Sequence, residues 1–130
     1  MNIQPVDRHF RKQERLCGEI RTEKLFASGK GFIVYPVRIV YLITDKEDNA
    51  PVRVLVSVPK KKIRLAVNRN RIKRLLRENY RINKQLLVAE MEKKDASLHL
   101  GIVYLSNELT DYGCIGEKMV AAIQRLVKSL

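Results

Sequence analysis

The chain has few of the residues on which disulfide scaffolds and small metal sites depend. Its 130 residues include only two cysteines, Cys17 and Cys114, which lie far apart and form no C-x-x-C motif. This usage favours two reduced thiols over a disulfide framework. The two histidines, His9 and His99, are also isolated, with no second ligand at the spacing of a zinc site. We therefore expect no metal site in the protein.

Membrane and enzyme signatures are absent as well. No apolar run reaches the roughly 20 residues of a transmembrane helix, and residues 1–15 are polar, without the apolar segment of a signal peptide. The sequence therefore predicts a cytoplasmic protein with no membrane partner. It contains no glycine-rich phosphate loop, no Ser-His-Asp or Cys-His signature and no paired acids in a catalytic motif. We expect no catalytic residues in the chain itself.

Acidic residues are almost missing from one stretch, residues 60–84. It holds eleven of the 26 Lys and Arg residues and a single acid, Glu78. The net charge of +12 is therefore concentrated here, since the rest of the chain is close to neutral. A solvated helix surface normally mixes both signs. Positive charge gathered on one segment is typical of proteins that bind nucleic acid.

The same stretch has the periodicity of an amphipathic α-helix, in which successive residues turn by about 100°. One arc of the helix is apolar and contains Leu65, Ile72, Leu75, Leu76, Ile82 and Leu86. The opposite arc contains Arg69, Asn70, Lys73, Arg74, Arg77, Arg81 and Lys84, with Tyr80 and Leu87 at its edge and Arg71 beside the apolar arc. We expect one face to pack against a core. The other presents cations whose mutual repulsion a polyanion would relieve.

The rest of the chain alternates helical and extended patterns. Residues 10–28 have helical spacing, with a stop at Gly29. The expected inward positions of this helix are Phe10, Leu16, Ile20, Leu25 and Phe26. Residues 31–35, 37–44, 52–58 and 98–105 are predicted strands, with Pro36 at a bulge or an edge position. Residues 45–51 form a turn, and helices are expected at 63–92 and at 111–129, the last one capped by Thr110.

This order of elements predicts the fold class. The sequence α-β-β-β-α-β-α indicates a single domain over residues 1–130, in which residues 1–8 form a loose arm. The class is α/β (α+β), a two-layer sandwich with helices against a four-stranded mixed sheet.

Residues 66–77 resemble the signature of a known family. They read AVNRNRIKRLLR and are similar to the form A-x-x-R-N-R-x-K-R-x-x-R of the bacterial ribonuclease P protein subunit. The preceding strand end and basic loop, 57–63, also resemble that family, although Arg64-Leu65 replaces a Gly-Asn pair common there. The resemblance implies that the basic helix lies in a left-handed β-α-β crossover, against the usual right-handed rule.

The resemblance also implies a function, as part of a ribonucleoprotein endonuclease that removes the 5′ leader of precursor tRNA. The implied RNA-binding residues are Arg69, Asn70, Arg71, Lys73, Arg74, Arg77, Arg81, Lys60, Lys61 and Lys62. Aromatic side chains would line a cleft for the leader, and the candidates are Phe26, Phe32 and Tyr41, each of which could equally belong to the core. The implied partners are the catalytic RNA and precursor tRNA, with no obligatory protein partner. Mg²⁺ would be bound chiefly by the RNA.

Two other classes of function stay open on the sequence. A structural RNA-binding module, such as a ribosomal-type protein, would bind RNA but would not stimulate precursor cleavage. A self-sufficient nuclease would cleave RNA alone with a metal ion and would depend on a single Asp or Glu. The twelve-residue signature and the lysines before it argue against the first class, and the scattered acids argue against the second.

Overall fold

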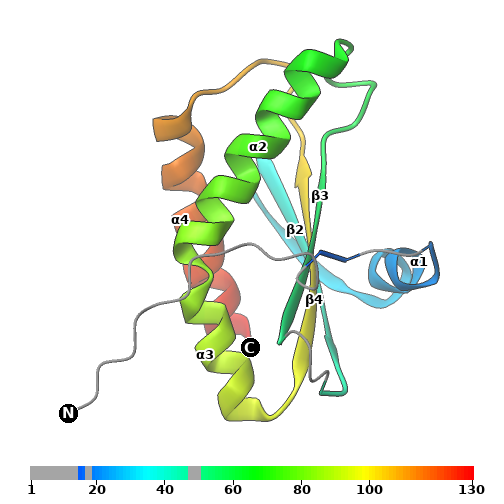
Figure 1. The fold of residues 1–130 in the computed structure, drawn as a ribbon, viewed down its shortest axis with the longest axis vertical. Helices are drawn as coiled ribbons and strands as arrows, with labels where there is room; N and C mark the ends of the chain where they lie inside the picture. The colour runs from blue at the N-terminus through cyan, green and yellow to red at the C-terminus, as the bar shows by residue number, and fades with distance from the viewer. Residues whose placement is uncertain (1–14, 17–18, 47–50) are drawn as a thin grey trace.

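The computed structural model describes residues 15–16, 19–46 and 51–130, and a four-stranded mixed sheet lies at its centre (Figure 1). The strands are β1 (Lys30–Val34), β2 (Val37–Thr44), β3 (Val52–Ser57) and β4 (Ser97–Tyr104), in the spatial order β1-β2-β4-β3. β2 pairs antiparallel with β1 and β4, whereas β3 and β4 are parallel. A parallel pair needs a crossover connection, and the helices between β3 and β4 supply it. The predicted mixed class, the four-stranded mixed sheet and the order of the elements are confirmed.

Helices cover both faces of this sheet (Figure 1). α2 (Ala66–Asn83), α3 (Gln85–Lys94) and α4 (Tyr112–Ser129) lie on one face, and the short helix α1 (Glu19–Ser28) lies on the other. Side chains alternate along the strands, so that successive residues point into the core on one face of the sheet and then into the core on the other. β3 directs Val52, Val54 and Val56 into the larger core beneath α2–α4, while β2 directs Val40 toward Leu25 of α1.

The predicted helix over residues 63–92 is divided into α2 and α3. α2 begins only at Ala66, because residues 60–62 form a turn in which the Lys62 N–H donates to the Pro59 carbonyl at 3.0 Å. The division falls at Lys84, whose side chain is buried. No Gly or Pro stands between residues 66 and 94, so the sequence carries none of the residues that usually signal a break.

The buried face of α2 and α3 is rotated relative to the predicted apolar arc. Leu76 is buried as expected, but Leu65 and Leu86 are 66% and 53% exposed. Tyr80 and Leu87, which the sequence placed at the edge of the polar arc, are buried. The rotation of a helix depends on the position of its neighbours, and that position is not contained in the hydrophobic pattern of the helix alone.

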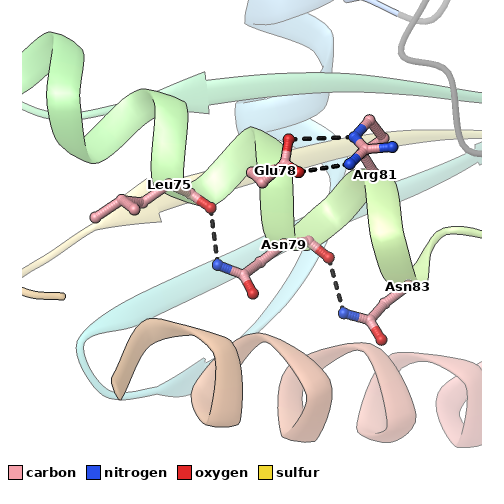
Figure 2. Close-up of polar contacts among 5 residues, drawn as sticks. All are labelled: Leu75, Glu78, Asn79, Arg81 and Asn83. Carbon is pink, nitrogen blue, oxygen red and sulfur yellow. Dashed lines mark hydrogen bonds and ion pairs between the residues drawn. The ribbon is translucent and has the colours of Figure 1, made fainter. Parts of the chain in front are cut away.

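Close packing between α2 and α4 fixes this rotation. Asn79 of α2 is buried, and its Nδ2 donates to the Leu75 carbonyl at 2.9 Å (Figure 2). Asn83 Nδ2 donates in turn to the Asn79 carbonyl at 2.8 Å (Figure 2). On α4, Gly116 faces this position, and a Cβ there would lie 3.0 Å from Asn79 Oδ1. The absence of a side chain at Gly116 therefore allows the two helices to approach.

The N-terminal helix is shorter than predicted. α1 starts at Glu19, whereas Arg15 pairs with Val54 at the edge of β3 and the Leu16 N–H donates to the Val54 carbonyl at 2.8 Å. The predicted stop is confirmed, because α1 ends at Ser28 and the Gly29 N–H donates to the Leu25 carbonyl at 2.8 Å. A Cβ on Gly29 would come within 2.4 Å of that carbonyl oxygen.

The inward positions of this segment were predicted only in part. Leu16 and Leu25 are buried, as expected. Ile20 and Phe26 are 82% and 41% exposed, so their assignment to the core was wrong. Phe10 lies outside the described residues.

Two turn assignments also need correction. Pro36 lies in the tight turn between β1 and β2, where its carbonyl accepts the Leu105 N–H at 2.7 Å, and not at a bulge or an edge position. α4 is capped by Asp111 instead of Thr110, since Asp111 Oδ1 accepts the Cys114 N–H at 2.7 Å.

Candidate nucleic-acid interface

Four of the predicted RNA-binding residues meet on the exposed face of α2. Asn70, Arg74, Arg77 and Arg81 line a shallow hollow of about 340 Å³ together with Glu78. Their spacing of three and four residues places them on neighbouring turns of the helix. Guanidinium groups are planar donors that match the oxygen pairs of phosphate. This hollow therefore has hydrogen-bond donors that suit the phosphodiester backbone of a nucleic acid.

The other three predicted residues of α2 lie outside this hollow. Arg71 is exposed and Lys73 is half-buried. Arg69 has a structural contact, because its Nη1 donates to the carbonyl oxygens of Ile63 at 3.1 Å and Arg64 at 2.6 Å. These two bonds hold the loop before α2 against the first turn of the helix. The helical wheel could not show this, since the acceptors belong to the non-helical segment.

The single acid of the basic stretch pairs with Arg81. Arg81 Nε donates to Glu78 Oε2 at 3.1 Å, and its Nη2 donates to Oε1 at 2.5 Å (Figure 2). The hydrogen bonds from Arg81 hold the pKa of Glu78 below its usual value. The same hydrogen bonds raise the pKa of Arg81. Glu78 thus fixes the direction of one arginine in the row, a role that the sequence did not predict.

The three lysines before α2 form a second cationic surface. Lys60, Lys61 and Lys62 are all exposed. Lys61 and Lys62 line a hollow of about 480 Å³ with residues 63–65, Asn68 and the loop after β4, from which Asn107 contributes. Arg69 bonds the backbone of the same segment, so the lysine loop is held beside the first turn of α2.

The structure does not bring the three candidate aromatic residues together. Phe26 lies on the α1 side of the sheet, where a Cβ on Gly101 would meet its Cζ at 3.6 Å. Phe32 and Tyr41 pack against the larger core on the opposite side, with ring centroids 6.4 Å apart. The Arg125 guanidinium of α4 lies 4.6 Å from the Phe32 centroid, as in a cation–π contact. The three rings therefore cannot line one cleft, and only Phe26 is left on the α1 side.

A groove runs along α1 that the sequence did not predict. It has a volume of about 790 Å³ and is lined by Ile20, Arg21, Lys24, residues 42–46, Asp95, Ala96 and His99. Arg21 and Lys24 are three residues apart, so both reach the same side of the helix. The groove combines apolar walls with three basic residues and two acids, Asp45 and Asp95. The signal in the sequence was the pair Arg21 and Lys24.

Arg15 is a further basic residue that the sequence did not single out. Burial lowers the pKa of the Arg77 guanidinium, and the positive charge of Arg15 lowers it further. The two side chains are therefore close enough to repel each other, although they are far apart in the chain. No local pattern links them, because only the pairing of Arg15 with the edge of β3 brings them together.

Two kinds of site are not indicated in the described part of the chain. Across residues 15–16, 19–46 and 51–130, no three His, Cys, Asp or Glu side chains gather where they could hold a metal ion. None of the helices in these ranges has both the length and the hydrophobicity needed to span a bilayer. The thiol of Cys114 is free and exposed, and Cys17 lies outside the described residues.

Known proteins of one family resemble this chain in sequence and in fold. The family model described as "Ribonuclease P" matches residues 10–113. The ribonuclease P protein component of Porphyromonas gingivalis (strain ATCC 33277) is 38% identical over 115 residues, which cover 88% of this chain and 84% of that protein. The ribonuclease P protein component of Chlorobium phaeobacteroides is 39% identical over 102 residues, which cover 74% and 70% of the two chains.

Two solved structures share the fold at lower sequence identity. The Staphylococcus aureus RNase P protein has a TM-score of 0.67 at 17% identity, over 87% of this chain and 94% of that one. The Thermotoga maritima RNase P protein has a TM-score of 0.66 at 21% identity, over 86% and 96% of the two chains.

Proposed function

The chain belongs to the family of ribonuclease P protein components and is a subunit of that endoribonuclease, and we propose that it binds the catalytic RNA through α2. The observation that carries this proposal is the meeting of Asn70, Arg74, Arg77 and Arg81 in one hollow. The adjoining lysine loop extends the same basic surface. A phosphate backbone would neutralise this row and release its counterions, which favours binding.

We further propose that the α1 side of the sheet holds the 5′ leader of precursor tRNA. Its groove has apolar walls and basic residues, and the half-exposed ring of Phe26 lies on the same side of the sheet. Stacking on an aromatic ring and cations that follow the backbone are the two usual means of holding an unpaired strand. Phe32 and Tyr41 take no part in this proposal, because they pack on the opposite side.

The chemical step in this proposal belongs to the RNA. Hydrolysis of the phosphodiester that joins the leader to the tRNA would use Mg²⁺ bound chiefly by the RNA. Two observations support this assignment: no three His, Cys, Asp or Glu side chains gather in the described residues, and the hollow of α2 is lined by three arginines with Asn70 and Glu78. The protein would contribute affinity for the precursor over the mature product, because only the precursor carries a leader.

Precursor-tRNA cleavage by a bacterial ribonuclease P RNA at low Mg²⁺ tests this proposal. The reaction is followed with the RNA alone, the protein alone and both together. We expect cleavage at the mature 5′ end when both are present and little with either alone.

Two other outcomes would contradict the proposal. Cleavage by the protein alone would identify a self-sufficient nuclease. Binding to the RNA without any gain in cleavage would identify a structural RNA-binding module that shares the basic helix.

A further inference from the structure

Backbone pairing directs Arg15 toward the α2 side of the sheet. Arg15 forms a parallel bridge with Val54 of β3, and the next residue, Leu16, donates its N–H to the Val54 carbonyl. Residues paired across strands point to the same face, and neighbours along a strand point to opposite faces. Val54 points into the core beneath α2, whereas Leu16 is buried with Leu25 on the α1 side. Arg15 therefore projects on the α2 side, at the outer edge of β3, the edge that does not pair with β4.

Arg77 lies on the side of α2 that is turned away from α4, because it is two residues, about 200° of helical turn, from Asn79, which faces Gly116 of α4. It follows the buried Leu76 and is half-buried itself, and it also lines the hollow with Asn70 and Arg74. The lowered pKa of Arg77, caused by burial and then by the charge of Arg15, agrees with this placement. Two guanidinium groups from separate segments thus converge beside the row of cations on α2.

We propose that Arg15 and Arg77 together hold one backbone phosphate of bound RNA at the outer edge of β3. The inference rests on the proposed function and adds a site to it. Two guanidinium groups from separate segments present two planar sets of N–H donors, and a phosphodiester placed between them accepts hydrogen bonds from both. Arg15 is an exposed residue of the described chain, so an RNA strand can reach it.

The position of this site connects the two RNA-binding surfaces. The segment of Arg15 and Leu16 contacts the α2 side with one residue and the α1 side with the next. A phosphate held at this edge would fix the RNA where the hollow of α2 meets the side of the sheet that carries the α1 groove. The phosphate can belong to the catalytic RNA or to precursor tRNA, since both present the same chemistry.

Charge-removing variants test the shared phosphate. Arg15→Gln, Arg77→Gln and the double variant are compared with wild type for binding to a transcribed bacterial ribonuclease P RNA over a range of KCl concentrations. Lys118→Gln, an exposed cation of α4, is the matched control for the loss of one charge. We expect each single variant to lose about fivefold to tenfold in affinity. The slope of log affinity against log salt should fall by about 0.7 to 0.9.

The double variant separates one shared phosphate from two independent contacts. If both arginines hold the same phosphate, the double variant loses little more affinity than either single variant. The slope of log affinity against log salt then falls by the value for one phosphate contact, about 0.7 to 0.9, and not by twice that value. Additive losses with a twofold fall in slope would overturn the proposal. So would an Arg15→Gln protein that behaves like the Lys118→Gln control.

Two further arms complete the test. Repeating the titration with holoenzyme on precursor and on mature tRNA shows which RNA supplies the phosphate, because a loss confined to the precursor assigns it to the leader. Arg15→Lys keeps the positive charge but lacks the planar guanidinium group. It should recover part of the affinity, and this recovery would show that the loss in Arg15→Gln does not come from misfolding. If wild type binds neither RNA, the proposed function fails and this site with it. If wild type binds and Arg15→Gln is unchanged, the site alone fails.

Discussion

Single cations of α2 serve different purposes, although the sequence presents them as one row. Arg74 lies exposed in the hollow, Arg69 bonds the carbonyls of the preceding loop, and Arg81 is held by Glu78. Side-chain chemistry alone does not separate these roles, since all three are guanidinium groups. The neighbours supplied by the fold decide which arginine is available for RNA and which one orders the protein.

Arg69 and Arg74 should differ in their effect on stability. Arg69→Ala removes two hydrogen bonds to backbone carbonyls, and we expect a loss of about 1 kcal/mol in the free energy of unfolding. Arg74→Ala should change stability by less than about 0.5 kcal/mol, as is usual for a surface position, while it weakens RNA binding. Urea unfolding and RNA titration of both variants measure the two effects. Equal stability of the two proteins would show that the loop contacts of Arg69 are energetically unimportant.

Glu78→Gln should remove a small pH-dependent part of the stability. Hydrogen bonds from Arg81 lower the pKa of Glu78, so the folded state binds this proton less tightly than the unfolded chain does. The contribution is complete at neutral pH and is lost as the pH falls below about 4. It is small because the Glu78 side chain is 42% exposed.

Thermal unfolding at pH 7 and pH 3 measures this contribution. The Tm difference between wild type and Glu78→Gln should be present at pH 7 and should shrink at pH 3. Glu117→Gln, an exposed acid of α4, is the control. A Glu78→Gln effect of equal size at both pH values would contradict the assignment.

At the scale of whole elements, contact between α2 and α4 decides which residues of the basic helix face solvent. The buried Asn79 and the facing Gly116 bring the two helices close. This contact turns Tyr80 inward and leaves the row from Asn70 to Arg81 at the surface. Any change that moves α4 relative to α2 should therefore also disturb the hollow that we propose binds RNA.

Two glycines of α4 offer a matched test of this contact. A Cβ on Gly113 would meet only Asp111 Oδ1 at 3.7 Å, so Gly113→Ala should stabilise the protein by about 0.5 kcal/mol through reduced backbone entropy. A Cβ on Gly116 would lie 3.0 Å from Asn79 Oδ1. Gly116→Ala should therefore be less stable than Gly113→Ala by about 1 to 2 kcal/mol. Urea unfolding measures both, and equal stabilities would mean that α2 and α4 are not in tight contact.

At the scale of the molecule, the sheet separates two surfaces with different properties. The side of α2 carries a dense basic row, while the side of α1 carries a groove with apolar walls and the half-exposed Phe26. The first suits a folded RNA with regular phosphates, and the second suits an unpaired strand. This division agrees with the two proposed RNA contacts, one on each side of the sheet.

Phe26 and Phe32 should give opposite results, since they lie on opposite sides of the sheet. Phe26→Ala should lower the preference for precursor over mature tRNA by about tenfold, if the ring stacks on one base of the leader. Its effect on stability should be small, because the ring is 41% exposed. Phe32→Ala should leave the preference unchanged but reduce the free energy of unfolding by about 2 kcal/mol, since the ring packs against the core. Dissociation constants of holoenzyme for both RNAs, together with urea unfolding, measure this. If only Phe32→Ala lost the preference for precursor tRNA, the leader would lie on the α2 side of the sheet, and the proposed placement on the α1 side would be wrong.

Local sequence determined the element types, their order and the basic character of α2. Gly29 predicted the end of α1, and the signature at residues 66–77 predicted the family. These features depend on residues close in the chain, whose spacing can be compared directly with the periods of a helix and a strand. Asn70, Arg74, Arg77 and Arg81, which the periodicity placed on one arc, line one hollow for this reason.

Tertiary structure decided the relations between distant segments. The break at Lys84, the rotation that buries Tyr80, and the opposite placement of Phe26 and Phe32 all depend on neighbours that come from other elements. The approach of Arg15 to Arg77 is the clearest case, since a bridge to β3 joins residues that share no local pattern. Periodicity describes which side of an element is apolar, whereas packing against the rest of the chain determines where that side points and what it meets.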